Sequence, residues 1–255
     1  MTWPFQILAL ADRYSLYVPD LLFFGESTTD AAERTPAFQA DCLAATLDRL
    51  HVRRCTAVGF SYGGMVASSL AERWPGLVGS LVLSSSVFVM TESISSEMKQ
   101  RLGVSSWPEI LLPASEEELE TMLSISIYRK LWFPRFLYRD FLHAMFKNSK
   151  KKVELLEAMV VSQREDDKPP SLPKYFFDLL QCGLVLYGEN DNIFHLKLAH
   201  DMKENVLGQT LCVPLFAYIS QCYRKGRASP SLGEAFCVQH KELLGVMHAQ
   251  ESSDI

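Results

Sequence analysis

Residues 55–67 read CTAVGFSYGGMVA, and this stretch decides the fold of the 255-residue chain. Its first six residues are small, β-branched or apolar and predict a short buried strand. Gly59-x-Ser61-x-Gly63 follows, and then a helical pattern that ends near Trp74. A strand, a sharp turn and a helix together are the setting in which Gly-x-Ser-x-Gly forms a nucleophile elbow. We therefore predict Ser61 as a nucleophile at the carboxyl end of a strand.

The elbow makes specific demands on the residues around Ser61. Its turn forces Ser61 into a sparsely populated backbone region, which costs about 1–3 kcal/mol. In the elbow Gly59-Phe60-Ser61-Tyr62-Gly63, the two glycines lie two residues on either side of Ser61, where side chains would collide. The N–H of Tyr62 would face a developing oxyanion. The alternative is a glycine-rich turn without chemistry, because so short a pattern also occurs by chance.

Composition limits the class of protein. A chain of 255 residues that is 48% hydrophobic can bury one sizeable core with an insertion. A net charge of −5 gives no electrostatic basis for binding nucleic acid. Six scattered cysteines without a C-x-x-C pair favour a reducing compartment, and we expect a cytoplasmic protein. No integral membrane segment or secretory signal is expected, because no apolar run reaches about 18–20 residues and the start lacks a basic region.

The first part of the chain, residues 1–90, alternates helices and strands. Helical patterns fall within residues 5–13, 36–50 and 62–74, and strand patterns within residues 15–20, 55–60 and 77–84. Such alternation predicts an α/β core, in which helices cover a mostly parallel sheet.

Residues 91–178 break the alternation, because they are helical in pattern and rich in aromatic residues and charges. We interpret them as an inserted helical cap. Their aromatic side chains either pack the cap helices together or line a pocket over Ser61, since ligand pockets favour domain interfaces. The lysine-rich run at 147–152 is either a solvated helix face or a membrane-surface patch. Residues 179–255 return to the core.

A candidate acid lies in this second core part. Residues 182–187 predict a buried strand, and Asp191 lies in the loop that follows it. A carboxylate after a parallel strand stands where the acid of a catalytic triad would lie; Glu189 is the local alternative. Asp191 has a structural alternative too, as a turn former or as the N-cap of a helix near Leu196.

Three motifs together resemble a known family: YVPDLLFFGES at 17–27, VGFSYGG at 58–64 and LYGENDNIF at 186–194. The chain resembles the α/β-hydrolases, and within them the plant branch that is similar to meta-cleavage-product hydrolases and monoacylglycerol-lipase-like esterases. The resemblance implies Ser61 as nucleophile and Asp191 as triad acid. It implies a small apolar molecule or ester as substrate, with no cofactor and no metal.

Two departures from the family's pattern bear on activity. The family has a hairpin, a central strand and a His-Gly loop ahead of the region where this chain begins, and that loop donates the second oxyanion N–H. The central strand normally lies between the strands at Tyr17 and Val58. We therefore expect an apparently truncated core, in which the sheet is interrupted or these two strands pair directly.

The triad base is the second departure. The family has a histidine after the acid, but residues 220–224 hold none, and the segment that follows aligns Ala228 with the histidine. His240 is the best substitute, on an expected closing helix at 236–250; His195 and His248 are weaker candidates. Residues 211–219 predict a strand, which Pro214 places at a sheet edge.

Two functions remain open at this point. The first is a serine hydrolase that acts on a carboxylic ester, or a carbon–carbon bond, of an apolar small molecule and is impaired by the missing histidine and His-Gly loop. The second is a non-catalytic hydrolase-like protein or truncated gene product that binds a small apolar ligand under its cap. The sequence does not determine the oligomeric state.

Overall fold

The computed structural model of the chain describes residues 3–127, 134–146, 149–161, 184–188, 190–202, 211–214 and 245–249. The first part contains α1 (Pro4–Leu10), β1 (Tyr14–Tyr17), α2 (Pro36–Arg49), β2 (Cys55–Phe60), α3 (Tyr62–Arg73) and β3 (Val78–Ser84). These bounds confirm the predicted order of helices and strands. The alternation follows from local pattern, since α2 begins at a proline and is capped by the Thr35 side chain, which accepts a hydrogen bond from the Phe38 N–H at 3.2 Å.

The later elements divide into a helical segment and the rest of the sheet. The helical segment contains α4 (Glu92–Leu102), α5 (Trp107–Leu111), α6 (Glu116–Ser126), α7 (Arg135–Met145) and α8 (Ser149–Ala158), between the short strands β4 (Met90–Thr91) and β5 (Val160–Val161). After it come β6 (Leu184–Tyr187), α10 (Leu196–Met202), β7 (Leu211–Pro214) and β8 (Gly245–Ala249). The described part of residues 91–178 is thus mainly helical, as predicted.

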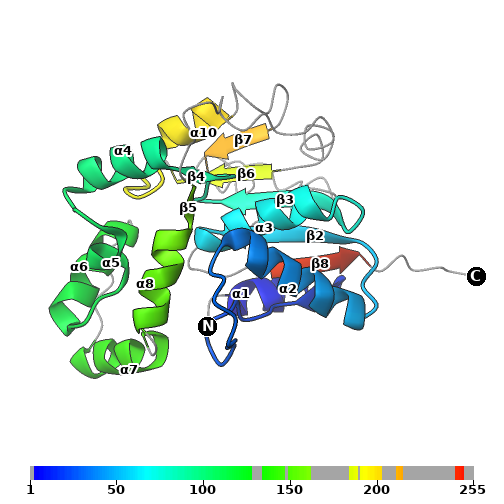
Figure 1. Cartoon of the computed structure of the whole chain (residues 1–255), viewed down its shortest axis with the longest axis horizontal. Helices are drawn as coiled ribbons and strands as arrows, with labels where there is room; N and C mark the ends of the chain where they lie inside the picture. Colours follow the sequence, from blue (N-terminus) through cyan, green and yellow to red (C-terminus); the bar gives the residue numbers. More distant parts are fainter. Residues whose placement is uncertain are drawn as a thin grey trace, which may run out of the picture.

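Within the described ranges, the main sheet has six strands in the order β1-β8-β2-β3-β6-β7 (Figure 1). Strands β2, β3, β6 and β7 run parallel, with Gly59 opposite Leu83 and Leu83 opposite Val185. Among the described strands β7 is the outermost one next to β6, which confirms the lateral edge position predicted from Pro214. Because parallel strands end on the same side, β2, β3 and β6 share one rim, which we call the carboxyl edge.

Helices α2 and α3 pack against each other, and α3 lies on β2 and β3 (Figure 1). Their interface is buried, with Val66 and Leu70 of α3 and Leu83 of β3 all at 0% exposure. Complete burial of one such aliphatic side chain contributes roughly 1.5–3 kcal/mol relative to leaving it in water. This layer holds the turn between β2 and α3 in place.

The helical segment leaves the sheet after β3 and lies to one side of it (Figure 1). Its two ends meet, because β4 and β5 pair in parallel, with Met90 opposite Val160 and Thr91 opposite Val161. Within the described ranges no helix combines the length and the apolar character that crossing a bilayer requires.

Strand β8 corrects two predictions. Residues 245–249 form a strand, so the closing helix predicted over 236–250 is wrong for this part. The sheet is also neither interrupted nor closed by direct β1–β2 pairing, because β8 lies between these strands and runs antiparallel to both. The physical reason is non-local: β1 and β2 each present unpaired backbone groups to the gap, and a strand satisfies both rows at once.

Candidate active site

Ser61 is the junction between β2 and α3. Its backbone has φ 52° and ψ −126°, a positive-φ conformation that is uncommon for a residue other than glycine. The Ser61 N–H donates to the Ser84 carbonyl at 3.1 Å, and the Ser61 carbonyl accepts from the Gly64 N–H at 2.9 Å. The strained turn that the sequence predicts is therefore present, and the side chain remains partly exposed.

Close approach explains two glycines of the elbow. A Cβ on Gly59 would lie 2.4 Å from the Gly63 carbonyl oxygen and 2.5 Å from the Gly64 Cα. A Cβ on Gly64 would lie 2.3 Å from the Ser86 hydroxyl oxygen. Real Cβ contacts are not this short, so strand, helix and the loop after β3 meet at a spacing that requires glycine. Of these two glycines, the Gly-x-Ser-x-Gly pattern contains only Gly59.

Tyr62 begins α3, and its N–H belongs to the first turn, where backbone donors have no partner within the helix. Its side chain is fixed by contacts with buried and half-buried residues. The phenol accepts from the Gln39 amide at 3.1 Å, and the Gln39 carbonyl accepts from the Leu22 N–H at 2.8 Å. The Phe24 ring lies 6.0 Å from the Tyr62 ring. Burial raises the pKa of the Tyr62 phenol far above its usual value, so the side chain stays neutral.

Asp191 lies in the loop after β6. One carboxylate oxygen accepts from the Ile193 N–H at 2.9 Å and from the Phe194 N–H at 2.8 Å. Burial raises the pKa of this carboxyl, and a hydrogen bond with the Ser85 side chain and the two backbone hydrogen bonds partly oppose that rise. Asp191 forms hydrogen bonds within its own turn, as the turn-former alternative predicts. It does not cap α10, because that helix begins at Leu196. Glu189 lies outside the described residues.

Ser61 and Asp191 come to the same rim of the sheet. They follow β2 and β6, which both pair with β3 and run in its direction. The end of β3 and the residue after it contact both neighbours, because the Ser84 carbonyl accepts from Ser61 and the Ser85 N–H donates to Leu186 at 2.9 Å. The two side chains predicted as nucleophile and acid are therefore brought together at the carboxyl edge.

The candidate bases are less well placed. His240 lies outside the described residues. His195 is exposed, and its Nδ1 accepts from the Lys197 N–H at 3.2 Å, whereas a triad histidine donates from Nδ1 to its acid. His248 is opposite Ser15 near the start of β1, at the end of β8 away from the carboxyl edge. Among the described residues, no group of three or more His, Cys, Asp or Glu is arranged to hold a metal.

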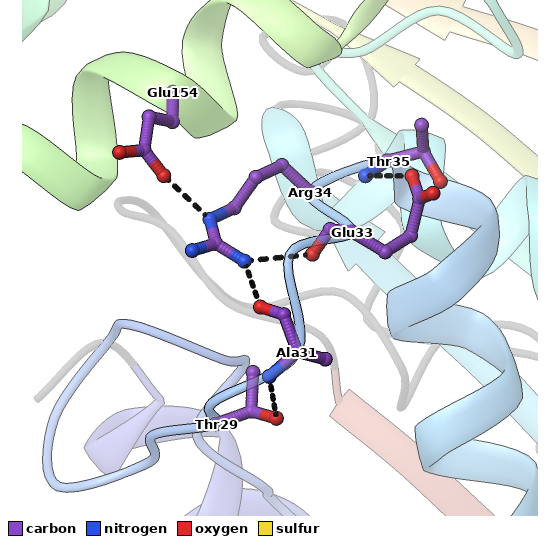
Figure 2. Close-up of polar contacts among 6 residues, drawn as sticks. All are labelled: Thr29, Ala31, Glu33, Arg34, Thr35 and Glu154. Atoms are coloured by element: carbon purple, nitrogen blue, oxygen red, sulfur yellow. Dashed lines mark hydrogen bonds and ion pairs between the residues drawn. The ribbon is translucent and has the colours of Figure 1, made fainter.

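The helical segment approaches the site through α8. Figure 2 shows Arg34, in the loop before α2, donating to Glu154 of α8 and to two backbone carbonyls of its own loop. The buried Lys152 of α8 places its ammonium nitrogen 5.3 Å from the centre of the Phe24 ring. Because Phe24 contacts Tyr62, only one aromatic ring separates α8 from the residue after Ser61.

Sequence reasoning missed four residues at this site: Gln39, Ser85, Ser86 and Tyr187. Gln39 had a signal in the sequence, because it lies among the apolar positions of α2. The structure buries it to 1% exposure. The two serines had none, since a polar run after a buried strand is typical of any loop.

The comparisons with known proteins agree with this architecture. The model of the alpha/beta hydrolase fold family matches residues 2–214. Lipase 1 of Psychrobacter immobilis is 25% identical over 195 residues, which is 74% of this chain and 57% of that protein. An uncharacterized protein of Mycobacterium tuberculosis is 38% identical over 84 residues, which is 33% of this chain and 25% of that protein. This chain thus spans about a quarter to three fifths of these relatives.

Solved structures show the same fold. A meta-cleavage product hydrolase from Pseudomonas fluorescens superposes with a TM-score of 0.60 at 18% identity, over 87% of this chain and 80% of that one. At this identity the likeness speaks for the fold alone. Together with the family match over most of its length, it shows that the chain belongs to the α/β-hydrolase fold family.

Proposed function

We propose that this protein is a serine hydrolase that acts on a carboxylic ester of an apolar small molecule, with hydrolysis of a carbon–carbon bond as the related reaction. One observation carries the proposal: Ser61 adopts the positive-φ turn between β2 and α3, at the same edge of the sheet as Asp191. Such strain at a polar residue is typical of functional sites. The lipase and meta-cleavage product hydrolase among the similar proteins are consistent with both bond types.

The proposed reaction proceeds through an acyl-enzyme. The Ser61 hydroxyl oxygen attacks the substrate carbonyl carbon while a base removes its proton, and the Tyr62 N–H stabilises the oxyanion that forms. The carbonyl re-forms as the bond to the alcohol breaks, and the base returns the proton to that leaving group. Water then attacks the acyl-enzyme by the same route and releases the acid. Asp191 orients the base and stabilises its protonated form.

His240 is our candidate for the base. Strand β8 begins at Gly245, opposite Val58, and runs antiparallel to β2 away from the carboxyl edge. The first residue of β8 therefore lies toward the edge where Ser61 and Asp191 lie. His240 is five positions earlier, and five extended residues reach at most about 17 Å.

Turnover is expected to be slow. One oxyanion donor is assigned here, the Tyr62 N–H, and loss of a single donor costs about 2.7–4 kcal/mol of transition-state stabilisation in a serine protease. The base is a substitute, because Ala228 aligns with the histidine of the family. Ala228 at the histidine position of the family therefore favours a second candidate, a non-catalytic member that binds a small apolar ligand.

We further propose that residues 91–178 act as a cap between core parts 1–90 and 179–255. The approach of α8 to Phe24, and the pairing of β4 with β5 at the two ends of the described helical segment, support this division. Aromatic side chains near the elbow favour an apolar acyl group. A cytoplasmic location belongs to the same proposal.

Labelling with a fluorophosphonate probe and turnover of p-nitrophenyl butyrate test the proposal, on the wild type, Ser61→Ala and His240→Ala. A hydrolase is labelled at Ser61 and turns over the ester, Ser61→Ala loses both, and His240→Ala lowers turnover by orders of magnitude. A folded wild type that neither labels nor turns over supports the non-catalytic candidate. Turnover that survives in His240→Ala removes His240 as the base.

A further inference from the structure

The loop after β3 contains a serine whose hydroxyl points at the nucleophile's own backbone. Ser86 is fully buried, and its Oγ donates to the Ser61 carbonyl oxygen at 2.6 Å; the Val87 carbonyl lies farther away, at 3.3 Å. The two serines are 25 positions apart in the chain. Only the Ser86 side of this bond is fully buried, and a short bond in a partly buried setting is stronger than its counterpart in water, because the local dielectric constant is lower.

Ser86 is itself held from two sides. Tyr187, at the end of β6 and only 1% exposed, donates from its hydroxyl to the Ser86 carbonyl. On the opposite side Gly64 approaches so closely that a Cβ there would lie 2.4 Å from the Ser86 Cβ. The side chain is therefore confined between β6 and the first turn of α3.

The neighbouring Ser85 faces the acid loop. It has φ 43°, a second positive-φ residue other than glycine at the carboxyl edge. Its N–H donates to the Leu186 carbonyl at 2.9 Å, and its side chain forms a hydrogen bond with Asp191. Two consecutive serines thus reach in opposite directions, one to the elbow and one to the acid loop.

We infer that Ser86 is a positioning residue for Ser61, and that Ser85 and Ser86 together set the distance between the elbow and the Asp191 loop. The Ser61 carbonyl accepts two hydrogen bonds, one from the Gly64 N–H in the first turn of α3 and one from the Ser86 hydroxyl in the loop after β3. The second donor ties the strained Ser61 backbone to β3. Without it the Ser61 carbonyl is bonded only to the helix that follows, the Ser61 N–H bond to Ser84 is the remaining bond from Ser61 to β3, and the nucleophile loses its fixed direction.

The test compares Ser86→Ala with Ser68→Ala. Ser68 is a matched control, because it is also buried and its hydroxyl also donates to a backbone carbonyl, that of Gly64 at 2.9 Å. Ser86→Ala should slow fluorophosphonate labelling and reduce kcat by roughly 10- to 100-fold, since small misplacements of a reacting group have effects of this size, while KM stays within about twofold. Ser68→Ala should change neither rate by more than about twofold.

Amide hydrogen exchange gives a readout that does not need activity. Ser86→Ala should accelerate exchange at the Ser61 and Gly64 amides by roughly three- to tenfold, as the loss of one hydrogen bond implies, and Ser68→Ala should not. Equal effects of both variants on labelling and exchange would overturn the inference. The labelling arm rests on the proposed function, so a wild type that is not labelled refutes that function, and the exchange pattern then decides the role of Ser86 alone.

Discussion

At the scale of single residues, the site contains two residues in unfavourable backbone conformations and one carboxyl group whose charged form is disfavoured by burial. Ser61 and Ser85 both have positive φ at the carboxyl edge, and the surrounding hydrogen bonds hold them there. Burial raises the pKa of the Asp191 carboxyl, so its ionised form opposes folding. A site that is built to react is commonly less stable than the rest of its fold.

Asp191→Asn tests this cost. Because the pKa of Asp191 is higher in the folded than in the unfolded chain, its contribution to stability is greatest at low pH and falls as pH rises through the folded pKa. The asparagine cannot ionise, so we expect a flatter dependence of unfolding free energy on pH above about pH 4. Urea unfolding from pH 4 to 7 measures it, with the exposed Asp30→Asn as control.

The same variant separates stability from chemistry. If Asp191 orients the base, Asp191→Asn should lower kcat by about 10⁴-fold, as the equivalent change does in a serine protease. An Asp191→Asn enzyme with wild-type kcat would show that the carboxylate only shapes its turn through Ile193 and Phe194.

At the scale of elements, β8 decides whether the sheet is continuous. Met247 is paired on both sides, with Leu16 of β1 and Thr56 of β2, whereas Ala249 is paired only with Tyr14. A central strand must satisfy two rows of backbone groups, which proline cannot do.

Met247→Pro should therefore destabilise the protein by about 3 kcal/mol or more, and Ala249→Pro by much less. Met247→Pro should also bind the dye ANS, because opening the gap exposes the apolar surface behind β1 and β2. Thermal unfolding and ANS fluorescence of the two variants measure both effects. Equal stability of the two proline variants would contradict the central position of β8.

At the scale of the whole molecule, one arginine joins the helical segment to the core. Arg34 donates to Glu154 of α8 at 2.8 Å (Figure 2). Its guanidinium lies 4.4 Å from the centre of the Phe23 ring. Lys151 of α8 lies over the same ring at 5.2 Å. The Arg34 side chain is 13% exposed and that of Glu154 is 52% exposed, so the arginine is the more buried partner of this ion pair.

Arg34→Ala and Glu154→Gln should differ accordingly. Glu154→Gln removes an ion pair with one exposed partner and should cost about 0.2–1 kcal/mol. Arg34→Ala also removes the cation–π contact and the bonds to the carbonyls of Ala31 and Glu33, and should cost roughly 1–3 kcal/mol. Urea unfolding of both variants measures the difference. Equal losses would mean that the cation–π contact and the carbonyl bonds of Arg34 add nothing to its ion pair with Glu154.

How much of this protein can be predicted from its sequence depends on how far apart in the chain the interacting residues lie. The turn at Ser61 could be predicted because its geometry depends on residues within a few positions, such as Gly59, where contact with the first turn of α3 requires glycine. The alternation of helices and strands through Ser84 was equally local in origin. The roles of Ser61, Asp191 and His240 in catalysis stay predictions.

The sequence by itself determined the α/β core, the turn at Ser61 and the strand-end position of Asp191, because periodicity and backbone sterics act over short distances. Only the tertiary structure decided which segment fills the gap between β1 and β2, and that Ser86 contacts Ser61. Both depend on pairing between residues far apart in the chain: a backbone edge accepts any strand that reaches it, and a hydroxyl binds whichever carbonyl the fold brings near.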